Sequence, residues 1–175
     1  MSWVLANLPT IAGHLLAHLL QAVPAIIASF VLAIPIARLA RVARPLRAVL
    51  VTGSSLLYAV PSLALFVILP IILATGIRDP LNVIVALTLY GLALLVPATA
   101  DALDAVDARV LDAATAMGMG RLRCFLTVEL PLAGPAILTG LRVVTVSTIS
   151  LTTVGAVLGV RSLGWLFTDG FQRGI

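Results

Sequence analysis

Residues 112–131, DAATAMGMGRLRCFLTVELP, decide how the rest of the chain is organised. They form the longest stretch that does not suit a lipid environment, and with Arg109 just before them they carry three of the eleven arginines. Apolar segments flank the stretch on both sides. Gly118 and Gly120 favour the left-handed turn that ends a helix, and Pro131 suits the first turn of the next one. The stretch therefore predicts a helix, a turn and a second helix between two membrane spans.

The residues around the start of this stretch carry a helical pattern. Three acidic residues favour the positive end of a helix dipole, so a helix is expected to begin near Asp101, Asp104 and Asp107. Apolar and small residues then recur at three- and four-residue steps, as on one helix face: Leu103, Val106, Val110, Ala114 and Met117. Ala113 and Ala114 are small enough for another surface to approach closely. Periodicity alone favours an ordinary cytosolic helical hairpin.

The full spacing adds a family resemblance. Asp112-Ala113-Ala114, three residues, Gly118, nine residues and then Val128-x-Leu130-Pro131 resembles the cytoplasmic EAA loop of permease subunits of binding-protein-dependent ABC importers. That pattern is Glu-Ala-Ala-x3-Gly-x9-Ile-x-Leu-Pro, so Asp replaces Glu and Val replaces Ile, both mild changes. The resemblance implies a helix–turn–helix that docks into a groove on an ATPase subunit. The residues it assigns to ATPase coupling are Asp112, Ala113, Ala114, Gly118, Leu130 and Pro131.

Composition places the chain in a membrane. Of its 175 residues, 61% are hydrophobic and 10% are charged, whereas a soluble domain carries about 25% charged residues. The sequence contains no lysine, which excludes a Walker A phosphate loop. We therefore expect this chain to bind no cofactor and a partner ATPase to use the ATP and Mg²⁺. The pI near 10.6 does not indicate nucleic-acid binding, because the arginines are scattered between apolar spans without interleaved aromatic residues. The one cysteine, Cys124, is interpreted as a small apolar side chain.

Four apolar segments are long enough to cross a bilayer, which takes about 20 helical residues. We predict a single all-α permease domain over residues 1–175, with spans at about 11–37, 48–75, 81–100 and 133–157. The arginine-rich loops 38–47 and 101–131 are expected to be cytoplasmic under the positive-inside rule, with the N-terminus outside. Residues 159–172 resemble the outer re-entrant stretch of the same family. Because small permeases of this kind usually have a further span, a fifth is expected to be missing, through truncation or a true absence.

Hydroxyl groups mark two candidate sides of a translocation path. Residues 60–65, VPSLAL, resemble a stretch typical of permeases for glycine betaine, choline and carnitine. The first candidates lie in or before it: Ser54, Tyr58, Pro61 and Ser62. The second set is on the fourth span: Arg142, Thr145, Thr148 and Thr152. Interhelical hydrogen bonding explains the hydroxyls of the first set equally well. Arg142 fits either a path or a side chain that extends to the inner interface.

His14 and His18 lie four residues apart near the outer end of the first span. Two ligands are too few for a metal site, so helix packing is the favoured interpretation and no metal site is predicted.

The family resemblance implies the all-α type I ABC importer fold, and with the missing Walker A loop it implies a transport subunit that is not an enzyme. The expected partners are two ATPase subunits, a second permease (the same or a different chain), an extracytoplasmic binding protein and lipid, but no nucleic acid. The expected cargo is a quaternary-amine osmoprotectant. Three alternatives stay open: the same machine carrying amino acids or another small solute, a small proton-coupled transporter or channel, and a membrane scaffold. A proton-coupled transporter usually needs an intramembrane carboxylate, and all seven acidic residues here lie in loops or at span ends.

Overall fold

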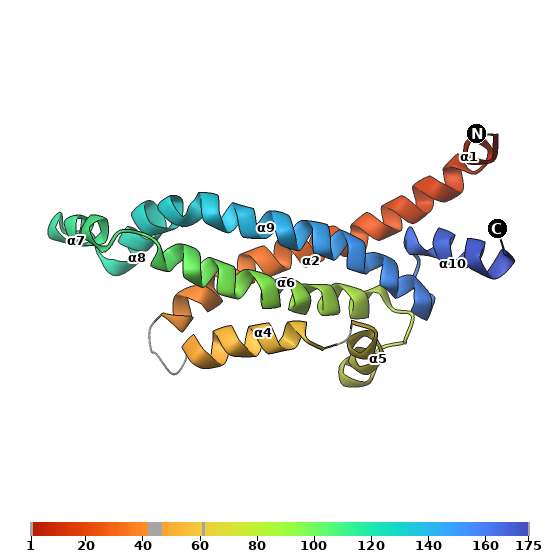
Figure 1. The fold of residues 1–175 in the computed structure, drawn as a ribbon, viewed down its shortest axis with the longest axis horizontal. Coiled ribbons are helices and arrows are strands. Elements are labelled where there is room, and N and C mark those ends of the chain that lie inside the picture. Colours follow the sequence, from red (N-terminus) through yellow and green to blue (C-terminus); the bar gives the residue numbers. More distant parts are fainter. Residues whose placement is uncertain (1, 42–46, 61, 175) are drawn as a thin grey trace.

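A computed structural model describes residues 2–41, 47–60 and 62–174, which form helices and connecting turns without a β-strand. Three helices make up most of the bundle: α2 (Leu8–Ala40), α6 (Pro80–Asp104) and α9 (Leu130–Thr152). Shorter elements join or extend them: α1 (Ser2–Ala6), η1 (Ala48–Thr52), α4 (Gly53–Tyr58), α5 (Ser62–Leu73), α7 (Ala108–Ala116), α8 (Arg121–Cys124), η2 (Phe125–Glu129), η3 (Thr153–Leu158) and α10 (Gly164–Arg173). Figure 1 shows an elongated bundle with α7 at one end and both termini near the other.

Helix α6 is the centre of the bundle. Asp79 caps its N-terminus by accepting a hydrogen bond from the amide of Leu81 at 2.9 Å, and Pro80 fits the first turn, where no amide donor is needed. In its most apolar 18-residue stretch 56% of the residues are buried, against 28% in the corresponding stretch of each of the other two long apolar helices. It packs against α2, α4, α5 and α9. In Figure 1, α9 and α4 lie on either side of it.

Small residues allow α2 and α6 to approach closely. The buried face of α2 is rich in alanine and includes Ser29, whose Oγ lies 2.7 Å from the carbonyl oxygen of Ala25 and 3.1 Å from that of Thr88 on α6. A Cβ atom at Gly91 of α6 would lie 2.1 Å from the Ser29 Oγ. This crossing therefore needs glycine at position 91, in line with the small residues that membrane helices place at their interfaces.

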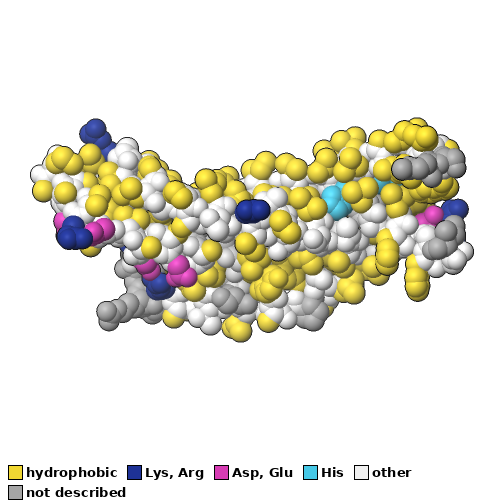
Figure 2. Space-filling model, turned by 45° about the horizontal axis from the view of Figure 1, so that its top comes forward, with side chains coloured by type: hydrophobic (Ala, Val, Ile, Leu, Met, Phe, Trp, Pro, Cys, Tyr) yellow, Lys and Arg dark blue, Asp and Glu magenta, His cyan; other side chains and the backbone are white. Residues whose placement is uncertain are grey.

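The helices are long enough to cross a membrane at three places. The segments are Leu8–Ala40, Pro80–Asp104 and Arg121–Leu158, and they extend three of the four predicted spans at one or both ends. Ala48–Tyr58 and Ser62–Leu73 are together long and apolar enough for a fourth crossing. The two helices are bent by 110° relative to each other, so this crossing would be a broken span. Apolar side chains cover most of the face in Figure 2, and charged side chains gather mainly toward its two ends.

One local prediction is wrong. Asp101 and Asp104 do not lie at a helix start, because α6 continues to Asp104 and places both carboxylates in its last turn. Only Asp107 caps a new helix, α7, so the expected stripe is split between two helices. Carboxylates at the negative end of a helix are unfavourable by themselves. Here arginines from a distant part of the chain compensate them, which the local sequence does not reveal.

Candidate functional site

Helix α7 and the turn after it form the most prominent feature of the cytosolic loop predicted from sequence. The Asp107 carboxylate accepts a hydrogen bond from the amide of Arg109 at 2.9 Å and so caps α7. After nine residues α7 ends, and Gly118 adopts a φ of +84°. The amide of Gly118 donates to the carbonyl oxygen of Thr115 at 2.9 Å, and the amide of Met119 donates to that of Ala114 at 3.2 Å. The predicted helix is thus present, and so is the positive-φ turn at Gly118, whereas the same prediction for Gly120 is wrong, because its φ is −66°.

The Asp107 carboxylate is held ionised by its neighbour. Hydrogen bonds from the side chain and then the backbone of Arg109 lower the pKa of Asp107. The same side-chain pair raises the pKa of Arg109. Both groups are solvent-accessible, and the guanidinium Nη2 lies 2.7 Å from Oδ2 of the carboxylate. The pair therefore fixes a local cap and does not connect distant segments.

Helix α7 presents a small-residue face to solvent. Asp112 and Ala113 are exposed, whereas Ala114 is buried where α7 packs toward α8 and η2. Two large apolar side chains that follow α7 in the sequence are also exposed, Met117 by 71% and Leu122 by 61%. In a loop that the sequence predicts to lie in water, exposed apolar side chains of this kind indicate a surface suited to binding another protein.

Leu130 and Pro131 lie away from that face. Pro131 is exposed in the first turn of α9, and Leu130 packs against a buried cluster at the base of the loop: Ala37, Ala100, Ala102, Leu103, Phe125, Ala133 and Ile137. The six predicted coupling residues are thus divided between the helix α7, the turn at Gly118 and the start of α9, which lies at the base of the loop. Their role in ATPase coupling stays a prediction.

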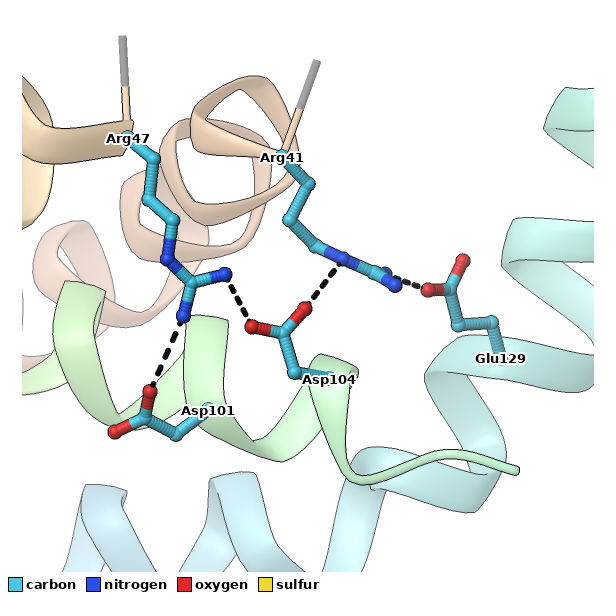
Figure 3. A network of polar contacts seen from close by, with 5 residues as sticks. All are labelled: Arg41, Arg47, Asp101, Asp104 and Glu129. Atoms are coloured by element: carbon cyan, nitrogen blue, oxygen red, sulfur yellow. Dashed lines mark hydrogen bonds and ion pairs between the residues drawn. The ribbon is translucent and has the colours of Figure 1, made fainter. Parts of the chain in front are cut away.

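A network of ion pairs lies beside this support (Figure 3). Arg41, which follows α2, places its Nε 2.9 Å from Oδ1 of Asp104 and pairs through Nη1 with Glu129. Arg47 pairs with the second oxygen of Asp104 and lies 3.6 Å from Asp101. Hydrogen bonding to Asp104, followed by the charge of that carboxylate, raises the pKa of Arg47. The network joins the end of α2, the start of η1, the end of α6 and the end of η2.

A cation–π contact adds to this junction. The guanidinium carbon of Arg38 lies 4.0 Å from the ring centroid of Phe125, a residue of the buried cluster described above. An arginine over an aromatic face at this distance is favourable by about 0.5–1 kcal/mol at exposed sites. The two arginines in the last turn of α2 and just after it, Arg38 and Arg41, therefore both contact the segment that leads into α9. The sequence pattern indicated only that both belong to a cytoplasmic basic loop.

The first set of candidate path residues lies mostly on α4. Ser54 Oγ donates to the carbonyl oxygen of Leu50 at 2.7 Å. Tyr58 is 47% exposed and meets Tyr90 of α6 edge to face, with ring centroids 6.0 Å apart. The hydroxyl of Tyr90 donates to the carbonyl oxygen of Val60. The Ser54 hydroxyl thus bonds to the preceding turn in η1, and Tyr58 remains accessible.

The second set occupies α9. Arg142 is exposed and has no ion-pair partner among the residues that the structure describes. Thr145 is half-buried and donates to the carbonyl oxygen four residues earlier at 2.8 Å. Thr148 and Thr152 are buried inside the subunit, and Thr152 Oγ1 lies 2.7 Å from the carbonyl oxygen of Thr148.

The two sets are not brought together in one chain, because α6 lies between α4 and α9 (Figure 1). Ser62 is half-buried at the first position of α5, and Pro61 lies outside the described residues. The assignment of both sets to a path stays a prediction.

The two histidines pack at the opposite end of the bundle. His14 stacks on Trp165 of α10 with ring centroids 4.8 Å apart, and His18 is buried. Gln21, on the same face of α2, donates to the carbonyl oxygen of Arg161 at 2.7 Å. In the described part of the chain no group of three or more His, Cys, Asp or Glu is arranged to hold a metal ion. The packing interpretation of His14 is thus confirmed, although Trp165 was not predicted as its partner.

Comparison with known proteins agrees with this architecture. In the part of the chain that the structure describes, the all-α bundle contains three helices long and apolar enough to cross a membrane, as in a multi-pass membrane protein. The family model described as "binding-protein-dependent transport system inner membrane component" matches residues 29–174, and the chain belongs to this family.

Several characterised relatives share part of their length with this chain. It is 36% identical over 126 residues to the ergothioneine transport permease/ergothioneine binding protein EgtU of Helicobacter pylori, covering 72% of this chain and 22% of that protein. It is 28% identical over 153 residues to the glycine betaine/carnitine/choline transport system permease protein OpuCD of Bacillus subtilis, covering 87% of this chain and 66% of that protein. The osmoprotectant import permease protein OsmW of Salmonella typhimurium is 32% identical, covering 69% and 57%.

A solved structure confirms the fold class. A chain in the crystal structure of an amino acid ABC transporter with histidines superposes with a TM-score of 0.75 at 18% identity, covering 91% of this chain and 77% of that one. The likeness supports the predicted importer fold and carries no information on cargo.

Proposed function

We propose that this chain is the transmembrane subunit of an ATP-driven importer and that α7 is the helix through which an ATPase subunit drives it. The observation that carries the proposal is the position of α7 at one end of the bundle. There it combines an exposed Asp112-Ala113 face, a positive-φ turn at Gly118 and exposed apolar side chains at Met117 and Leu122.

The partners follow from that role. Two permease subunits, each with one ATPase at its α7, form the assembly, and an extracytoplasmic binding protein delivers the solute. The N-terminus lies outside and the loops 38–47 and 101–131 lie in the cytoplasm, in agreement with the basic residues of both loops. ATP and Mg²⁺ are bound by the ATPase. ATP binding moves the docked α7 helices and switches the bundle halves between inward-open and outward-open states, which is alternating access.

The cargo that we propose is a quaternary-amine osmoprotectant. It is supported by the stretch at residues 60–65 and by the printed names of relatives such as OpuCD and OsmW. An amino acid is the alternative cargo, because the loop that resembles the EAA motif does not specify which solute is carried. A quaternary ammonium group is usually held by an aromatic cage, and this chain has only nine aromatic residues. We therefore assign tight binding to the binding protein and only weak, transient contacts to the permease.

The decisive experiment reconstitutes the permease in lipid with its ATPase and binding protein. ATP hydrolysis is measured with the binding protein empty, loaded with glycine betaine or choline, and loaded with amino acids. Stimulation by the quaternary amines alone supports both machine and cargo. Stimulation by amino acids keeps the machine and overturns the cargo. Failure of an intact permease to assemble with any ATPase overturns the importer function.

A further inference from the structure

Arg41 occupies a particular place relative to the loop that carries α7. Its two carboxylate partners are Asp104, the last residue of α6, and Glu129, the last residue of η2. Helix α7 and its turn lie between these two residues in the sequence. One guanidinium therefore joins both ends of the loop and connects them to the end of α2 (Figure 3).

The ion pairs of Arg41 are partly buried, and Glu129 is the most buried of the three side chains. The side chain of Glu129 is 12% exposed, against 28% for Arg41 and 35% for Asp104. A carboxylate with this little exposure is unfavourable when its cationic partner is removed. The planar guanidinium offers several donors in a fixed arrangement, so it can hold two carboxylates in a defined geometry, which a lysine ammonium does not reproduce.

Apolar packing already holds the helices together at this junction. The buried cluster that contains Ala37, Leu103, Phe125 and Ile137 draws on α2, α6, η2 and α9. Partly buried ion pairs contribute little net stability compared with such packing, whereas their directionality fixes one arrangement over others. The network is therefore better suited to setting the orientation of the loop than to keeping the bundle folded.

We propose that Arg41 is a positioning residue that transmits the movement of α7 to α2 by clamping the two ends of the loop. This inference rests on the proposed docking of α7 to an ATPase. When the ATPase displaces α7, the clamp makes Asp104 and Glu129 move with the end of α2 instead of letting the loop flex alone. Without the clamp, the ATPase still docks and hydrolyses ATP, but less of that work reaches the membrane helices.

The test compares solute imported per ATP hydrolysed in the reconstituted complex. Arg41→Gln and Glu129→Gln remove one partner each, and the double variant removes both. We expect this ratio to fall by about fivefold or more in each single variant. The double variant should lose little beyond a single one, because both changes break the same contact. Mere loss of folded protein lowers uptake and hydrolysis together and leaves the ratio unchanged.

Two further variants sharpen the result. Arg173→Gln makes the same substitution in an ion pair inside α10, where Arg173 Nε lies 3.0 Å from Asp169, and should keep the wild-type ratio. Arg41→Lys keeps the charge and so protects folding, but a single ammonium should give an intermediate ratio. Wild-type ratios in Arg41→Gln, Arg41→Lys and Glu129→Gln, with a coupled wild-type complex, overturn the clamp and leave α7 docking intact. Failure of the wild-type chain to bind an ATPase overturns the proposed function, and the clamp with it.

Discussion

Replacing Gly118 by alanine tests whether the turn after α7 sets the docking surface. Gly118 has a φ of +84°, and an added Cβ atom there would meet no other heavy atom within 4 Å. The cost of the substitution is therefore conformational and not steric. A non-glycine residue in the left-handed region costs about 1–2 kcal/mol. This lowers the population of the native turn by about 5- to 30-fold relative to alternatives.

The expected consequence is a weaker complex with the ATPase in a permease that remains in the membrane. Titrating lipid-embedded permease with the ATPase subunit should show an apparent Kd raised by up to about 5- to 30-fold for Gly118→Ala. Gly118→Val should be at least as damaging, because a β-branched residue is a stronger outlier at positive φ. Transport should fall as ATPase binding falls, and Gly118→Val should uncouple transport from ATP hydrolysis.

Gly120 provides the matched control for this experiment. It lies two residues further along the same loop, an added Cβ atom there also meets nothing within 4 Å, and its φ of −66° suits any residue. Gly120→Ala should therefore bind the ATPase like the wild type. Equal affinities for Gly118→Ala and Gly120→Ala would refute the role of the positive-φ turn.

Two further predictions concern packing and capping. Gly91→Ala places a Cβ atom 2.1 Å from the Ser29 Oγ and should lower the free energy of unfolding by about 1–3 kcal/mol, measured by thermal unfolding in detergent. At Gly13 an added Cβ atom meets nothing within 4 Å, so Gly13→Ala should not lower the free energy of unfolding. Equal melting temperatures for Gly91→Ala and Gly13→Ala would contradict the proposed close approach of α2 and α6. The pKa of Asp107 is lowered from 3.8 in the folded chain, so its ionised cap stabilises α7 above that pH and is lost as pH falls through the lower folded value. The protection of the α7 amides, measured as their exchange rate relative to the intrinsic rate at the same pH, should fall over that range, and Asp107→Asn, which keeps an acceptor but cannot ionise, should remove this pH-dependent loss of protection.

Local sequence patterns predicted the features of this fold that depend on neighbouring residues. The apolar segments gave the helices, because length and hydropathy decide which helices suit a bilayer. The turn at Gly118 was predictable because glycine tolerates positive φ where other residues do not. The predicted positions of the helix ends were less accurate. The chain leaves α6 at Asp104 and not near Ala100, since carboxylates in its last turn become acceptable only when Arg41 and Arg47 approach.

Contacts between distant segments account for what the sequence did not reveal. Arg41 and Glu129 are 88 residues apart, and no local period relates them. The stacking of His14 on Trp165 joins opposite ends of the chain in the same way. Ser29 and Gly91 fit together only once α2 and α6 cross, so neither residue indicates the contact alone. Pairing of this kind depends on the three-dimensional packing that residue periodicity leaves undetermined.

The placement of α6 constrains how the two candidate path sets could act together. Tyr58 on α4 and Arg142 on α9 are both exposed, yet α6 lies between their helices. A path lined by both sets within one chain would have to pass through the most buried helix of the bundle, which tight packing prevents. In the proposed pair of permeases no such passage is needed, because an exposed side chain of one copy is free to face an exposed side chain of the other. If Tyr58 and Arg142 both line the path, the path must therefore lie between two subunits, and a single chain carries only half of its wall.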